Sequence, residues 1–113
     1  MLQKLRSQPD LIVSVARYDH HVKRTIEQFK AVAQLVDGSR LHINEVWIEN
    51  ALVKYAYYRL TPSGVIVQGW DNAPHHPEVD THPHHTHEAD EVKESQVRCL
   101  DDVLTLLRNQ VGA

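Results

Sequence analysis

Histidine is concentrated in one stretch of this chain, between Trp70 and Asp90. Six of the nine histidines lie there, with three of the five prolines. The six are His75, His76, His82, His84, His85 and His87. Imidazole donates or accepts a proton near neutral pH, and it is the commonest metal ligand in proteins. The stretch therefore indicates either acid–base catalysis or metal binding.

Metal binding is one hypothesis for this stretch. Alternate residues of an extended chain share a face, so His82 and His84 can converge with Glu88, as can His85 and His87. For zinc or another divalent ion, this pattern predicts a ligand set of His82, His84, His85, His87 and Glu88. Asp71, Asp80 and Asp90 are further carboxylates able to complete a site. The spacing matches no established ligand motif such as HExxH.

Metal-independent RNA cleavage is the second hypothesis, and it needs no cofactor. It requires a base for the 2′-hydroxyl proton, an acid for the leaving oxygen, and cations at the phosphate. The candidate catalytic residues are His75, His76, His84, His85 and His87. The candidate supporting residues are Asp71, Asn72, Tyr55, Tyr57 and Arg59. A third hypothesis is a non-catalytic interaction protein that docks through its acidic loop.

The size and composition of the chain limit the class of protein. With 113 residues, 42% apolar and 24% charged, we expect one domain spanning residues 1–113. No apolar run approaches the roughly 18 residues of a membrane span. The single cysteine, Cys99, excludes an intramolecular disulfide and is typical of a cytoplasmic protein. The net charge of −3 indicates no general affinity for nucleic acid.

The first half of the chain predicts a helix followed by strands. Residues 2–8 form a short helix that Pro9 ends. The β-branched run in 10–17 predicts a strand, with Tyr18–His21 as the connection. A β-hairpin follows, with strands 26–36 and 40–48 around the turn Asp37-Gly38-Ser39. A shift in the apolar pattern predicts a bulge near Asn44–Glu45.

The second half predicts two more strands and a helix around the histidine-rich loop. The strands are 52–60 and 65–70, and Thr61-Pro62-Ser63-Gly64 is the turn between them. An ordered loop over 71–91 follows, and 92–99 is a candidate edge strand. Leucines at helical spacing after Asp101 predict an amphipathic helix that Gly112 ends. The predicted fold is α+β, an antiparallel meander of four to five strands with a helix packed on it.

Three motifs lie between Tyr55 and Asp90, namely Tyr55-x-Tyr57, Trp70-Asp71-Asn72-Ala73-Pro74-His75-His76-Pro77-Glu78 and Thr81-x-Pro83-His84-His85-x-His87. Together they resemble the motifs of the TumE family of toxin–antitoxin toxins. This match covers about a third of the chain. The chain departs from the family pattern at Tyr58, where relatives often carry histidine, and at Thr86, where lysine is common. These departures call into question any mechanism that needs those two residues.

The resemblance implies a toxin that is held inactive by a protein antitoxin, a small DNA-binding protein. By analogy with other small toxins of α+β fold, RNA is the expected substrate. We expect a cytoplasmic protein with no membrane partner. An exposed edge strand at 11–17 would allow pairing with a second copy as a homodimer.

Overall fold

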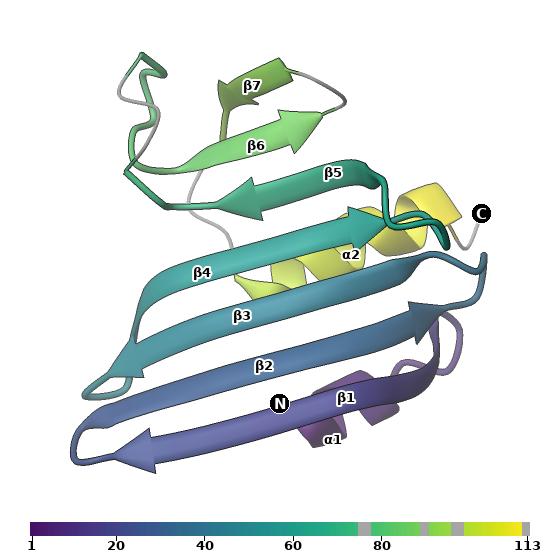
Figure 1. Cartoon of the computed structure of the whole chain (residues 1–113), viewed down its shortest axis with the longest axis horizontal. Coiled ribbons are helices and arrows are strands. Elements are labelled where there is room, and N and C mark those ends of the chain that lie inside the picture. The colour runs from purple at the N-terminus through teal and green to yellow at the C-terminus, as the bar shows by residue number, and fades with distance from the viewer. Residues whose placement is uncertain (75–77, 89–90, 96–98, 112–113) are drawn as a thin grey trace.

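The structure is a computed structural model, and it describes residues 1–74, 78–88, 91–95 and 99–111. Figure 1 shows one sheet with two helices behind it. The elements in chain order are α1 (Leu2–Arg6), β1 (Ile12–Lys23), β2 (Ile26–Leu35), β3 (Arg40–Ile48), β4 (Ala51–Leu60), β5 (Ile66–Asp71), β6 (His85–Glu88), β7 (Glu91–Glu94) and α2 (Leu100–Val111). The predicted α+β class and the antiparallel meander are confirmed.

The sheet is a meander because each strand pairs antiparallel with the next one along the chain, in the order β1 to β7. The predicted hairpin is confirmed as β2 and β3. Its turn contains Gly38 at φ 90°, a backbone conformation that favours glycine. None of the helices in the described part of the chain is long and apolar enough to cross a membrane.

β1 is longer than predicted, and the prediction of Tyr18–His21 as a connection is wrong. These residues continue β1 and pair with residues 28–31 of β2. Cross-strand contacts stabilise this extension of β1, because His20 stacks on Phe29 with ring centroids 4.3 Å apart. Its Nε2 also lies 3.0 Å from the Glu27 carboxylate. The pairing with a long neighbour outweighs the local preference for a turn.

The described sheet has seven strands, so the predicted count of four to five is wrong. The sequence did not predict β6, which lies inside the predicted loop 71–91. The candidate edge strand 92–99 corresponds in part to β7, which lies at the edge of the sheet but spans Glu91–Glu94. β6 and β7 each have only four residues. A strand this short shows no reliable hydrophobic period. It forms here because β5 offers a free edge to which β6 pairs.

The bulge predicted near Asn44–Glu45 lies in the neighbouring strand instead. The register of β3 on β4 shifts between Val46 and Trp47, where Val53 of β4 is the extra residue. β3 itself alternates regularly, so Glu45 and Trp47 share a face, and the Trp47 indole donates its hydrogen to the Glu45 carboxylate at 3.0 Å. The extra residue places Leu52, rather than Val53, opposite Trp47 on the helix-covered face.

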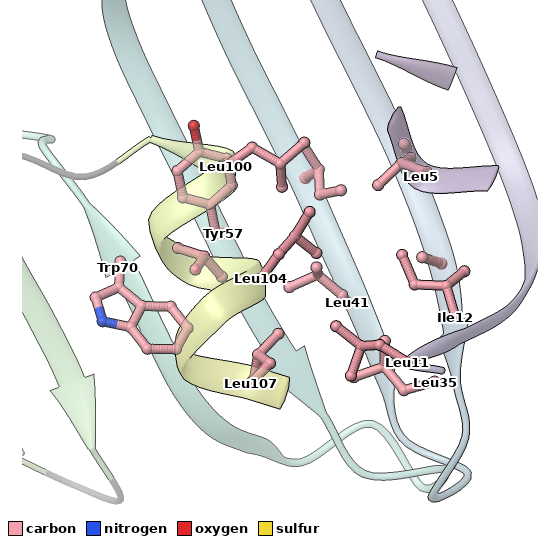
Figure 2. Packing of buried hydrophobic residues seen from close by; sticks show 14 of the residues in the cluster. Leu5, Leu11, Ile12, Leu35, Leu41, Tyr57, Trp70, Leu100, Leu104 and Leu107 are labelled. Carbon is pink, nitrogen blue, oxygen red and sulfur yellow. The ribbon is translucent and has the colours of Figure 1, made fainter. Parts of the chain in front are cut away.

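The core lies between the sheet and the two helices, which cover the same face (Figure 1). Figure 2 shows Leu104 and Leu107 of α2 between Trp70 and Leu41 of the sheet. Burying one such leucine contributes about 1.5–3 kcal/mol. The predicted amphipathic helix is confirmed, and Gly112, its predicted end, lies outside the described residues. Neither of the two described helices lies on the other face of the sheet, which we call the helix-free face.

Candidate functional site

Asp71, His85 and His87 come together on the helix-free face because of the pairing of β5 with β6. Asp71 lies directly opposite His85 in the register, and His87 follows two residues later on the same side of β6. Asp71 Oδ1 is 2.8 Å from His85 Nε2, and Asp71 Oδ2 is 3.3 Å from His87 Nε2. The two Nε2 atoms are 2.9 Å apart. We call these three residues the Asp–His–His cluster.

Backbone groups hold the cluster in place. The Ala73 N–H donates to Asp71 Oδ1 at 3.0 Å, and His85 Nδ1 donates to the Pro83 carbonyl oxygen at 2.9 Å. The side chains of His85 and Asp71 are 1% and 7% exposed, whereas that of His87 is 25% exposed. The cluster therefore consists of a buried, pre-organised pair, Asp71 and His85, and of His87, which solvent can reach.

Tyr58, one of the three tyrosines in the predicted strand 52–60, belongs to the same site, although it was not singled out among the supporting candidates. Its hydroxyl donates to Asp71 Oδ2, and its ring lies 5.8 Å from that of His87. Gly69 makes room for it, since a Cβ at that position would lie 2.2 Å from the Tyr58 ring. A glycine inside a strand indicates close approach of a neighbour, and this was the available sequence signal. Burial and the charge of Asp71 raise the pKa of the Tyr58 hydroxyl.

Two of the supporting candidates face the helices instead. The Tyr55 hydroxyl is 2.8 Å from His84 Nδ1, on the covered side of the sheet. Tyr57 is fully buried, and it donates to the Glu45 carboxylate at 2.6 Å. Burial and the neighbouring His85 lower the pKa of His84. Tyr55, Tyr57 and His84 therefore do not join the Asp–His–His cluster.

Arg59 and Asn72 have structural contacts. Arg59 binds the Asp37 carboxylate at 2.6 Å and stabilises the turn between β2 and β3. The Asn72 side chain accepts the Tyr55 N–H at 2.9 Å and donates to the Val53 carbonyl at 3.1 Å, which braces the end of β4. Both residues position the strands that carry the site rather than the site itself.

The predicted zinc ligand set is only partly brought together. His85 and His87 converge, but Glu88 binds Gln68 and Lys93 instead. His82 lies exposed in the turn that precedes β6. His75 and His76 lie outside the described residues. Among the residues that the structure describes, the group able to hold a metal ion is the Asp–His–His cluster. Asp71, which was expected to support the site, thus lies at its centre.

Two adjacent rows of cross-strand partners run over the helix-free face from β1 to β6. Direct partners in antiparallel strands share a face, so the members of a row line up side by side. The rows are Arg17, Val32, His42, Tyr58, Gly69 and His87, and next to it Asp19, Lys30, Asn44, Ala56, Asp71 and His85. Both rows end in the cluster.

A groove follows these rows, with a volume of about 370 Å³. Arg17, Lys30 and His42 line it, and Tyr58 belongs to both the groove and the site. By register, the strands β1–β5 place five cationic side chains on this face against the two carboxylates of Asp19 and Asp71. The five are Arg17, Lys23, Lys30, Arg40 and Lys54. The face is therefore basic, although the chain as a whole carries a net charge of −3.

Comparison with known proteins agrees with the resemblance seen in the sequence. The family model described as Toxin TumE matches residues 2–111, nearly the whole chain. No curated protein and no solved structure matches the chain significantly. The match extends well beyond the motifs of residues 55–90 and includes every strand and both helices. The chain therefore belongs to the TumE family of toxins.

Proposed function

We propose that this toxin stops growth by cleaving RNA on the helix-free face of its sheet. The family makes the chain a toxin of a toxin–antitoxin system, and the proposal concerns how it acts. One observation carries it. A carboxylate and two imidazoles lie at the end of a basic groove, with the Tyr58 hydroxyl between the groove and the cluster.

The groove supports RNA as the ligand. A polyanion is attracted by closely spaced Lys and Arg side chains, and the counterions released on binding make the affinity dependent on salt. Arg17, whose Nε also donates to the Asp19 carboxylate at 2.8 Å, and Lys30 lie on the two adjacent rows that lead to the cluster. A strand lying along these rows would bring a phosphate next to Tyr58 and His87. The exposed histidine and the tyrosine would then meet the ribose.

The proposed reaction is transfer of the phosphate to the neighbouring 2′-oxygen. His87, the exposed member of the cluster, accepts the 2′-hydroxyl proton as that oxygen bonds to phosphorus. Tyr58 donates its proton to the 5′-oxygen as the bond from phosphorus to that oxygen breaks. The products are a 2′,3′-cyclic phosphate and a 5′-hydroxyl. Asp71, in contact with both side chains, orients them. These steps use only side chains of the protein.

The experiment is cleavage of a single-stranded RNA by the purified protein, with the ends of the products identified. We expect 2′,3′-cyclic phosphate ends. His87→Gln should lower the rate by about 10²–10⁴-fold, the range for loss of a general base. His20→Gln is the matched control, because His20 lies on β1 and stacks on Phe29 on the helix-covered face. Intact RNA after incubation with folded wild-type protein would overturn the proposal.

Lysine substitutions test the groove separately from the chemistry. Lys30→Ala should weaken RNA binding and make its salt dependence shallower by about 0.7 per lost phosphate contact on single-stranded RNA. Lys4→Ala is the control, since Lys4 pairs with Asp101 on the helix side of the molecule. Equal effects of the two substitutions would place RNA elsewhere on the protein.

The family implies an antitoxin as the partner, and we propose that it is a small DNA-binding protein. Co-expression of the neighbouring reading frame should restore the growth of cells that make the toxin.

Pairing of two copies through β1 stays a prediction. β1 is an edge strand, but bulges near Ser14 and near Arg17 interrupt its register with β2. Such bulges discourage edge-to-edge pairing.

A further inference from the structure

We propose that Asp71, His85 and His87 bind a divalent transition-metal ion, with zinc as the best fit. This ligand set keeps two of the histidines predicted from spacing and takes its carboxylate from Asp71 of β5 rather than from Glu88. Their candidate ligand atoms all lie within 4.8 Å of one another. The inference goes beyond the proposed RNA cleavage, and its binding test does not depend on that activity.

The hydrogen bonds of His85 give the first argument. The Pro83 carbonyl can only accept, so His85 Nδ1 carries a hydrogen. In a neutral imidazole the other nitrogen, Nε2, then holds a lone pair. That lone pair faces a carboxylate oxygen of Asp71 at 2.8 Å. Two acceptors this close need a positive charge between them, either a proton or a metal ion.

The third ligand favours a metal ion over a proton. A proton bridges two atoms, but His87 Nε2 also converges on this point, 2.9 Å from His85 Nε2. Zinc bonds to nitrogen and oxygen of about 2.0 Å place neighbouring tetrahedral ligands roughly 3.3 Å apart. The observed separations are 2.8 Å from His85 Nε2 to Asp71 Oδ1, 2.9 Å between the two Nε2 atoms, and 3.3 Å from His87 Nε2 to the other carboxylate oxygen, Asp71 Oδ2. The two imidazole nitrogens and the carboxylate are therefore already close to the spacing that zinc requires.

The surroundings of the cluster match those of known metal sites. A metal-binding histidine usually donates its other ring N–H to a backbone carbonyl, which orients the ring. His85 does so to Pro83. Asp71 likewise accepts from Tyr58 and from the Ala73 N–H. These contacts fix the ligand atoms in advance of binding. The exposed edge of His87 leaves an approach for the ion and for a fourth ligand such as water.

The donor set determines which metal is expected. Two imidazoles and one carboxylate are typical of zinc and of other late first-row divalent ions. Magnesium prefers oxygen ligands and keeps much of its water. We therefore expect zinc and cobalt(II) to bind and magnesium not to compete.

Zinc binding has a consequence for RNA cleavage, and this part rests on the proposed function. The ion would occupy His87 Nε2, the atom that accepts the proton in the proposed reaction. One equivalent of zinc should therefore inhibit cleavage, and a chelator should restore it. If the protein cleaves no RNA at all, zinc titration still tests the metal site by itself.

The experiment is calorimetric titration of the chelator-treated full chain with zinc chloride, alongside the absorption spectrum of the cobalt(II) form. We expect one high-affinity site per chain. His87→Gln and Asp71→Asn should each weaken binding by at least about 100-fold, since each removes a ligand. Both variants are checked for folding by circular dichroism, and His87 is exposed enough for its variant to fold.

His84→Gln distinguishes this site from general binding by a histidine-rich tract. His84 adjoins His85, but its side chain contacts Tyr55 on the other face of the sheet. Zinc affinity should survive its substitution. Equal losses in His84→Gln and His87→Gln, or no high-affinity site in the folded wild-type chain, would overturn the inference. Binding of magnesium as tight as that of zinc would also overturn it.

Discussion

Tyr57 and Tyr58 are neighbours on β4, and each donates its hydroxyl hydrogen to a carboxylate. Tyr57 reaches Glu45 on β3, and Tyr58 reaches Asp71 on β5. Because successive residues of a strand point to opposite faces, the first pair is sealed beneath the helices. The second lies on the helix-free face beside His87. The same pair of chemical groups therefore occurs in two different surroundings.

The two tyrosine–carboxylate pairs differ in the groups that surround the carboxylate. Glu45 receives a second hydrogen bond from Trp47, and the pair is surrounded by core. Burial and the charge of Glu45 raise the pKa of Tyr57. Asp71 instead contacts two histidines and adjoins a groove. We expect changes at the Tyr57–Glu45 pair to alter stability and changes at the Tyr58–Asp71 pair to alter function.

The largest effect is expected from Tyr57→Ala. Truncating a fully buried aromatic side chain costs about 3–5 kcal/mol, and here Glu45 also loses a donor. Chemical denaturation of the purified variant measures this loss. A free energy of unfolding within about 1 kcal/mol of wild type would show that the covered pair is not structural.

Gly69→Ala should have the next largest effect. The added methyl group would lie 2.2 Å from the Tyr58 ring, so the ring must turn away from Asp71. We expect a cost of about 1–3 kcal/mol, as for other overpacked positions, together with loss of toxicity. In a Tyr58→Ala background the same substitution should cost much less. Additive losses in that double-mutant cycle would contradict the proposed clash.

Tyr58→Phe should separate function from stability. The substitution leaves the ring on Gly69 and removes only the hydroxyl that Asp71 accepts. We expect RNA cleavage to fall by about tenfold or more, a general-acid effect, while the free energy of unfolding changes by less than about 1.5 kcal/mol. RNA cleavage and urea unfolding are measured on the same preparation of the variant, so that the two effects are compared directly. Unchanged cleavage would remove Tyr58 from the proposed reaction.

The smallest effect is expected at Asp37, in the turn between β2 and β3. Burial alone would raise its pKa, but hydrogen bonds from Ser39 and Arg59, with the charge of Arg59, lower it below the ordinary value. This contribution to stability is therefore complete above about pH 4 and is lost as the pH falls through the folded-state pKa. Asp37→Asn should make the free energy of unfolding depend less on pH on the acid side, as measured by urea unfolding at a series of pH values. An unchanged pH dependence would contradict this role of Asp37.

The elements that were predicted correctly have strong local signals. The hairpin of β2 and β3 follows from alternation around Asp37-Gly38-Ser39, and α2 from leucines at helical spacing. Because side chains alternate along a strand, the predicted strand 52–60 also implies that Tyr57 and Tyr58 lie on opposite faces. It could not say which face the helices would cover, since that depends on packing between distant segments. The local sequence pattern thus predicts an element and which residues share each of its faces. It does not predict which other elements pack against each face.

The histidine-rich stretch shows the same division. Its composition by itself indicated a candidate site near residues 70–90, with proton transfer or metal binding as the expected chemistry. Only the tertiary structure decided that His85 and His87 meet Asp71 while His84 meets Tyr55. The reason is strand register, because a shift of one residue would send each of these side chains to the opposite face. That register comes from the pairing of β6 with β5, which no local pattern encodes.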